Sequence, residues 1–175
     1  LGAGMAGGAN VIAALSSFAG ANPAWARGNG STNAAFDVSV EEDTSRDSET
    51  THIAESVDYF AFNQAGILSA APRQDVLETG RLTLDHNPQT VTLERSYDNP
   101  VVIAHVATEN GPQPVNVRVS GVSGRDLTLQ LQEPNHLDGA HVDEAVNYMV
   151  VEAGSWVLPD GTLLEAGKAQ SHKLS

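Results

Sequence analysis

The sequence has no cysteine, few aromatic residues and few basic residues, and each shortage excludes a class of protein. Without cysteine the chain forms no disulfide and performs no thiol chemistry, although this alone does not fix its compartment. Aromatic residues make up 5% of the chain, so a core must consist mainly of Val, Leu, Ile and Ala. Lys and Arg number 9 against 22 Asp and Glu, which gives a formal net charge of -13. An acidic surface of this kind repels nucleic acid and anionic membranes, so we expect no nucleic-acid partner.

Long apolar runs are also missing, since no stretch approaches the roughly 20 residues that a membrane-spanning helix needs. The N-terminal stretch MAGGANVIAALSSFAGANPAWA does imitate a signal peptide, with an apolar middle and an Ala-x-Ala end. It lacks the basic n-region that such segments carry. We interpret it instead as the opening strand and loop of a repeat, and we expect no membrane span.

The chain does contain an internal repeat. THIAESVDYFAFNQAG from Thr51 and AHVDEAVNYMVVEAG from Ala140 share the order His, two residues, Glu, one residue, Val, one residue, Tyr. Upstream of them, the segment from Val11 aligns without a gap with the segment from Val102. The aligned pairs include Ile12 with Ile103, Gly20 with Gly111, Arg27 with Arg118, and Glu42 with Glu133. A repeat of this length indicates a structural unit used twice, each of roughly 90 residues.

The alternation of apolar and polar residues predicts strands in both copies. In the second copy we expect strands at residues 81–85, 90–95, 101–107, 115–120, 126–132 and 144–151. LTLQLQ from Leu127 and FDVSV from Phe36 alternate as strands with one buried face should. Helical periodicity of useful length is missing. We therefore predict an all-β fold of tandem small antiparallel β-sandwiches, with about six strands per unit.

The two copies are not equally complete. VLETGRLTLDH from Val76 opens the second copy, and LLEAGKAQSHK from Leu163 resembles the same opening segment. The first copy, in contrast, begins near its third strand, so we expect it to lack its leading strands. The predicted domains are residues 1–75 as an incomplete first sandwich, 76–158 as a complete second sandwich, and 159–175 as the leading strand of a third repeat or an exchanged tail.

Two explanations of this incompleteness are open. The C-terminal segment of one chain could complete the first unit of the next, which would give a head-to-tail fibre by strand donation. Alternatively, the chain is a fragment of a longer tandem repeat protein. In either case the expected protein partners are neighbouring copies of the same unit, as a homo-oligomer or as part of a longer repeat chain.

The second copy resembles the H-type lectin-like β-sandwich modules found in agglutinins and, often in tandem, in large secreted bacterial proteins. The shared features are a strand that begins with Gly, in GRLTLDH, an NPVV strand and an Arg-bearing VRV strand. The resemblance covers Gly80 to Gly154 well and Val11 to Gly66 in part. H-type lectins bind sugar with an acidic residue, an Arg and aromatic side chains, and Arg118 and Arg27 match the strand Arg. The resemblance therefore implies carbohydrate binding, with glycans as partners.

The repeated His-x-x-Glu has a catalytic or metal-binding interpretation and a structural one. A metal pair needs both residues on one face, which a helix supplies, whereas positions three apart on a strand point to opposite faces. Glu at the head of a buried strand face costs several kcal/mol if it is charged and unpaired. We therefore predict structural ion pairs between Arg118 and Glu144 and between Arg27 and Glu55, with each His capping a loop and no catalytic residue.

The acidic loop after residue 132 is a second candidate site. Glu133, Asp138 and Asp143 could hold calcium, which takes 6–8 oxygen ligands, or the loop is simply a solvated acidic surface. No cofactor is certain from the sequence, and calcium is the one candidate. The candidate ligand-binding residues are Arg118, His141, Asp138 and Trp156.

Two function classes follow from these observations. The first is a non-enzymatic extracellular or cell-surface module for carbohydrate or surface binding, in adhesion. The second is a structural repeat in an extracellular fibre or matrix. An enzyme is not expected, because tandem sandwiches seldom supply the convergent cleft that catalysis needs.

Overall fold

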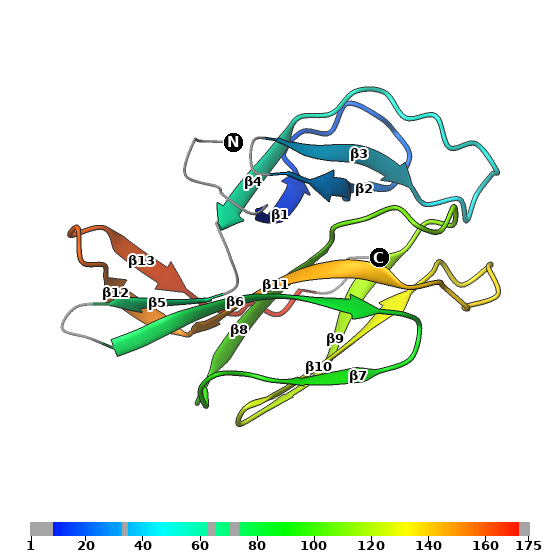
Figure 1. Ribbon diagram of the computed structural model, residues 1–175. Coiled ribbons are helices and arrows are strands. Elements are labelled where there is room, and N and C mark those ends of the chain that lie inside the picture. The colour runs from blue at the N-terminus through cyan, green and yellow to red at the C-terminus, as the bar shows by residue number, and fades with distance from the viewer. Residues whose placement is uncertain (1–8, 33–34, 63–65, 71–73, 172–175) are drawn as a thin grey trace.

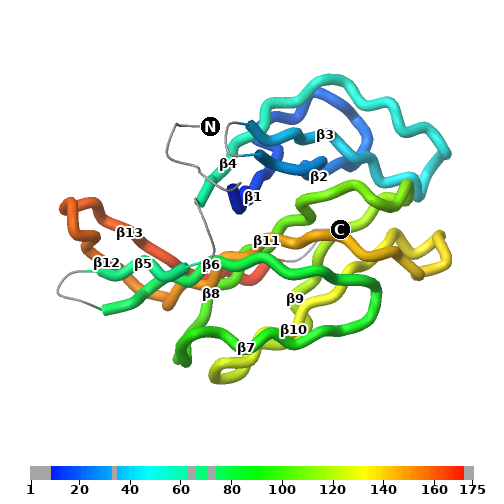
Figure 2. Tube along the Cα trace, viewed as in Figure 1, coloured from blue at the N-terminus to red at the C-terminus, as the bar shows by residue number. Residues whose placement is uncertain are grey.

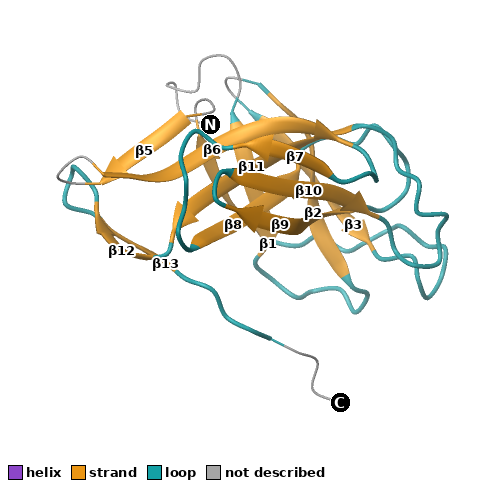
Figure 3. Ribbon diagram, turned by 90° about the horizontal axis from the view of Figure 1, so that it is seen from below, coloured by secondary structure: helices purple, strands orange, loops and turns teal. Residues whose placement is uncertain are grey.

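The protein is built from β-strands and loops, as the alternation of apolar and polar residues predicts. The computed structural model describes residues 9–32, 35–62, 66–70 and 74–171, and this part of the chain contains 13 strands and no helix (Figures 1 and 3). All pairings between these strands are antiparallel. The predicted all-β fold class is confirmed.

The second unit is a sandwich of two sheets. One sheet has the strand order β5-β6-β11-β8 and the other β7-β10-β9. The strands are β5 (Gly66–Ala70), β6 (Gln74–Leu84), β7 (Gln89–Thr92), β8 (Pro100–Val106), β9 (Asn116–Ser123), β10 (Asp126–Gln132) and β11 (Glu144–Glu152). The last five agree closely with the strands that the sequence predicts.

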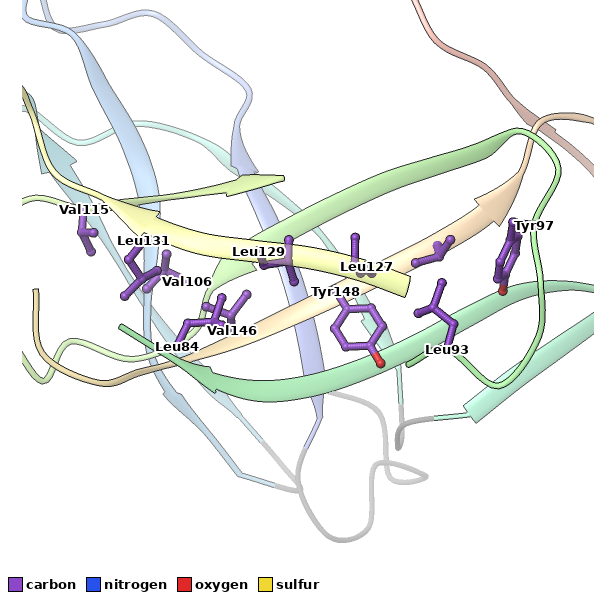
Figure 4. Close-up of a cluster of buried hydrophobic side chains, with 11 residues drawn as sticks. Leu84, Leu93, Tyr97, Val106, Val115, Leu127, Leu129, Leu131, Val146 and Tyr148 are labelled. Atoms are coloured by element: carbon purple, nitrogen blue, oxygen red, sulfur yellow. The ribbon is translucent and has the colours of Figure 1, made fainter. Parts of the chain in front are cut away.

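The core of this sandwich forms because inward side chains alternate with outward polar ones. In β10 the residues Leu127, Leu129 and Leu131 are buried, and the residues between them are more exposed. Figure 4 shows these side chains meeting Val146 and Tyr148 of β11 across the gap between the sheets. Burying each such Leu contributes roughly 1.5–3 kcal/mol to stability.

The first unit repeats part of this arrangement. It consists of β1 (Asn10–Leu15), β2 (Ala24–Ser31), β3 (Phe36–Glu42) and β4 (Val57–Phe62), with β1 paired to β4 and β2 paired to β3. The registers match those of the second unit: Ile12 lies opposite Phe60 as Ile103 lies opposite Met149. The sequence alignment therefore describes a true structural repeat.

The core of the first unit is less covered than its counterpart. Tyr59 is 48% exposed, whereas the equivalent Tyr148 is 6% exposed. Phe36, whose ring centroid lies 4.6 Å from that of Tyr59, is half-buried, whereas the equivalent Leu127 is fully buried. Among the described residues, no strand equivalent to β6 or β7 covers the first unit.

The predicted domain boundary after residue 75 is wrong. β5 pairs with β6 and so belongs to the sheet of the second unit, although its residues were assigned to the first. β6 is longer than the predicted strand because it has two partners. Residues 74–79 of β6 pair with β5 and residues 77–84 pair with β11, so the boundary lies before β5.

The same hairpin follows the second unit. β12 (Gly154–Val157) pairs with β13 (Leu163–Ala166), and Trp156 lies opposite Leu164 as Leu68 of β5 lies opposite Leu77 of β6. The segment from Leu163 thus does resemble the opening segment of a unit, but its hairpin begins before the predicted boundary at 159. Residues 172–175 of the predicted tail lie outside the described residues.

The first unit packs on the outer face of the second. Figures 1 and 2 show β1 to β4 above the sheet that contains β6, β11 and β8. A second apolar cluster joins the two units and the C-terminal hairpin. It contains Ile12, Ala70, Val76, Leu77, Met149 and Val151, with Phe62, Trp156, Leu164 and Ala166 packed against them. The amide of Asn147 in β11 also donates to the Val11 carbonyl, at 2.8 Å.

Candidate functional site

Glu144, the first residue of β11, accepts hydrogen bonds from the loop that follows β8. The Thr108 hydroxyl donates to it at 2.6 Å, and the backbone amides of Asn110 and Gly111 donate at 2.8 Å each. His141 lies between two carboxylates, with Nε2 3.2 Å from Glu144 and Nδ1 2.9 Å from Glu133. This network joins the end of β10, the loop before β11 and the loop after β8.

The first unit contains the same network. The Ser17 hydroxyl and the backbone amides of Ala19 and Gly20 donate to Glu55, both amides at 2.8 Å. His52 contacts Glu42 through Nδ1 and Glu55 through Nε2, the second at 3.2 Å. The repeated His-x-x-Glu is therefore part of a loop anchor that is used once in each unit.

The anchor changes the ionisation of its own groups. The Ser17 hydroxyl and the Gly20 amide lower the pKa of Glu55 to about 2. Hydrogen bonds to Glu42 and Glu55 raise the pKa of His52 above its usual value. Burial alone would raise the pKa of Glu144, but the Thr108 hydroxyl and the loop amides hold it below its usual value. These shifts favour charged carboxylates inside the loop anchor.

Each loop anchor also contains a glycine, Gly20 in the first unit and Gly111 in the second, for which the sequence alone predicts no role. A Cβ at Gly20 would lie 2.4 Å from the His52 ring, and a Cβ at Gly111 would lie 3.0 Å from the His141 ring. Each ring therefore packs directly on a glycine of its loop. The sequence does contain a signal for this contact, because Gly20 aligns with Gly111 and His52 aligns with His141.

Arg27 does not pair with Glu55, so the predicted ion pairs within each unit are wrong. Arg27 is 0% exposed and reaches from β2 into the second unit, where its guanidinium donates to Glu144 at 2.7 Å. It also donates to the carbonyls of Thr108, Gly111 and Gln113, at 3.1, 3.2 and 3.0 Å. Arg27 thus binds the loop anchor of the neighbouring unit.

Strand geometry explains why Arg27 points toward the second unit. Arg27 lies opposite Ser39 in the β2–β3 pair, and side chains alternate between the two faces of a strand. Val38 and Val40 align with the inward Leu129 and Leu131, so Arg27 points away from its own core. Glu41, two residues after Ser39 and therefore on the same face of β3, forms a second ion pair with Arg27. Burial raises the pKa of Glu41, and the charge of Arg27 opposes that rise.

Arg118 occupies the equivalent position on β9 but is exposed, and it forms no ion pair with any residue that the structure describes. It lines an open groove of about 550 Å³ together with Trp25, Asn116, Gln132 and His136. The Trp25 indole donates to Glu41 at 2.7 Å and to the Val115 carbonyl at 3.1 Å. This groove crosses the boundary between the two units.

The other predicted ligand-binding residues do not gather at this groove. His141 is buried in the loop anchor, and Asp138 accepts the Ala140 amide at 3.0 Å within a turn. Trp156 packs in the cluster between the units, and its indole donates to the Glu152 carbonyl at 2.9 Å. Only Arg118 of the four predicted residues lies in the groove.

The three acidic residues predicted to hold calcium also do not converge. Glu133 is buried and faces His141, whereas Asp138 and Asp143 are exposed. In the described ranges, no group of three or more His, Asp or Glu side chains is arranged to hold a metal ion. The described part of the chain likewise has no helix that is long and apolar enough to cross a membrane.

Comparison with known proteins finds a similarity to part of one long protein, halomucin. No family model matches the chain, and no solved structure matches it. Over 128 residues the chain is 32% identical to halomucin of Haloquadratum walsbyi. The match covers 70% of this chain but spans only 1% of halomucin, so the chain is similar to a very small part of a very long protein.

Proposed function

We propose that this chain is a non-enzymatic structural segment of an extracellular surface protein, in which consecutive sandwich units are held at a fixed orientation. The observation that carries this proposal is the Arg27 side chain, which is buried in the loop anchor of the following unit. A buried guanidinium with five acceptors requires a specific geometry, so it favours one relative orientation of the units.

Three further observations support this function. The apolar cluster around Ile12 and Met149 continues the contact between the units beyond Arg27. The histidines and glutamates that suggested chemistry are committed to the loop anchors. The similarity to halomucin supports a location at the extracellular surface, because that long protein bears the name of a mucin.

The experiment that tests the proposal is NMR relaxation of backbone amides in the intact chain. If the orientation is fixed, the amides of β2 and β10 report the same rotational correlation time, because the two units tumble as one body. Separate, shorter correlation times for the two units would show a flexible connection and refute the proposal.

A second candidate function is carbohydrate binding, in adhesion, which the resemblance to H-type lectins implies. The groove beside Arg118 favours it, because Arg118, Asn116 and Gln132 supply hydrogen-bond donors and Trp25 supplies an aromatic ring. A glycan array probed with the intact chain and with Arg118→Ala separates the two functions. Glycan binding that is lost in Arg118→Ala would favour the lectin-like function. Array signals that are the same for the intact chain and for Arg118→Ala would exclude this groove as a glycan-binding site.

A further inference from the structure

One asparagine of the chain, Asn29, begins an Asn-x-Ser tripeptide. It is followed by Gly30 and Ser31, and the other asparagines begin neither Asn-x-Ser nor Asn-x-Thr. This tripeptide, with a middle residue other than proline, is the acceptor sequence for N-linked glycosylation of exported proteins. Because so short a motif also arises by chance, its place in the fold decides whether the protein can carry a sugar there.

Asn29 lies in a bulge near the end of β2. The pairing of β2 with β3 skips two residues between Gly28 and Ser31, so Asn29 and Gly30 are unpaired in this register. Gly30 has a φ of 101°, a left-handed conformation that favours glycine. Asn29 is exposed, and its side-chain amide forms no hydrogen bond with any residue that the structure describes. The bulge thus presents a free amide outside the strand ladder.

The second unit shows that the fold does not require asparagine at this bulge. β9 has a bulge at the same place, where Ser120 and Gly121 align with Asn29 and Gly30. The Ser120 hydroxyl donates to the Thr128 carbonyl at 3.3 Å, so this serine supports its own hairpin. The Asn29 side chain makes no equivalent bond among the described residues, and local structure therefore does not explain its presence.

The backbone on both sides of Asn29 is fixed by the second unit. Gly28 is buried, and a Cβ there would lie 2.8 Å from the Cα of Ala107. The Gly30 amide donates to the Ala107 carbonyl at 3.0 Å. Asn29 therefore lies at the edge of the contact between the units, with its backbone held and its side chain exposed. A sugar attached there extends into solvent, because neither glycine contact involves the Asn29 side chain.

We propose that Asn29 is an acceptor for an N-linked oligosaccharide, which an oligosaccharyltransferase adds from a lipid-linked sugar phosphate. The Asn29 Nδ2 forms a bond with the anomeric carbon of the sugar, and the bond between that carbon and the phosphate oxygen breaks. The amide nitrogen loses one proton and the lipid phosphate leaves with the bonding electrons, so nothing is oxidised or reduced.

Ser31 supplies the hydroxyl of the acceptor sequence. In the folded chain this hydroxyl donates to the Ala9 carbonyl at 2.8 Å. The transferase therefore reads the hydroxyl before the first unit has folded, during export. The exposure of Asn29 then allows the chain to fold with the sugar attached.

This inference rests on the proposed function only for the location of the protein outside the cell, because export brings the chain to the transferase. The relaxation experiment reports the orientation of the units and needs no sugar. Absence of sugar at Asn29 would leave that result unchanged. Two units that tumble separately would, in turn, leave the acceptor sequence unchanged.

Export of the intact chain through a secretory pathway that contains an oligosaccharyltransferase tests the inference. A Gly-rich extension with the same Asn-Gly-Ser tripeptide is added after the C-terminus, and sugar on this extension selects the chains that have met the transferase. We expect these chains to carry a second sugar, located at Asn29 by peptide mass spectrometry. Asn29→Gln and Ser31→Ala should carry the sugar of the extension alone, whereas Ser31→Thr should carry both.

The matched control is Asn116→Gln, which should carry both sugars, since Asn116 is exposed but begins no acceptor tripeptide. Two results would overturn the inference. One is a parent chain with sugar on the extension and none at Asn29. The other is a second sugar that persists in Asn29→Gln, which would place the modification at a different residue.

Discussion

At the scale of single residues, each histidine of the repeat lies between two carboxylates. A neutral imidazole can donate from only one nitrogen, so His52, which contacts carboxylates through both nitrogens, is satisfied best as the imidazolium. In His52 the hydrogen bonds to Glu42 and Glu55 raise the pKa accordingly. The charge of this histidine stabilises the loop anchor.

A pH dependence follows from this shift. Since the pKa of His52 is raised on folding, its stabilising contribution is fully present below the unfolded value of 6.5 and is lost as pH rises through the folded value. We expect the stability difference between wild type and His52→Gln to shrink as pH rises through this range. The measurement is chemical denaturation of both proteins over a series of pH values.

The stability difference between wild type and His52→Gln must be measured, because another histidine, His105, affects the stability of both proteins with the opposite pH dependence. Burial lowers the pKa of His105, so protonation of that residue destabilises the fold as pH falls. The control is His136→Gln, since His136 is exposed. A difference between wild type and His52→Gln that is constant with pH would contradict the assigned role.

At the scale of elements, β6 joins β5 to the rest of the second unit's sheet because it pairs with both β5 and β11. Its position against β11 depends on the direct contact between Gly80 and the Tyr148 ring. The contact explains why a residue without a side chain stands in the middle of a long strand, where glycine otherwise reduces stability.

Gly80→Ala should therefore destabilise the protein by about 1–3 kcal/mol, because the added methyl group overlaps the tyrosine ring. The matched control is Gly121→Ala in β9, where a Cβ would lie 3.9 Å from Thr128, an ordinary contact. Thermal or chemical unfolding of the two variants measures the contrast. Equal stability of both variants would show that β6 can shift and that the glycine is not required.

The sequence allowed the elements of one unit to be predicted, but not the contacts between units. Alternation marked Leu127, Leu129 and Leu131 as core, and the alignment identified the two copies. The prediction places β5 in the wrong unit because GILSA is short and its partner, β6, lies on the other side of the predicted boundary. The partner of Arg27 was missed for the same reason, since alternation shows that a side chain points outward but not which surface it meets.

At the scale of the whole molecule, the two units form one body through a polar contact and an apolar one. Arg27 is one of only 9 Lys and Arg residues in a chain of net charge -13, and it is buried at the contact between the units. Glu144 has a role within its own unit and a role between the units. It accepts hydrogen bonds from the loop after β8, and it forms an ion pair with the Arg27 guanidinium of the first unit.

The central claim is that Arg27 and Glu144 couple the two units, and a double-mutant cycle tests it most directly. Either Arg27→Met or Glu144→Gln alone should cost roughly 3–5 kcal/mol of stability, because each leaves a buried charged or polar group without its partner. The two changes together should cost less than their sum by about 1 kcal/mol or more. The parallel cycle of Arg118→Met with Glu144→Gln should be additive, since Arg118 is exposed and makes no contact with Glu144. Additive effects of Arg27 and Glu144, or equal coupling in both cycles, would contradict the account.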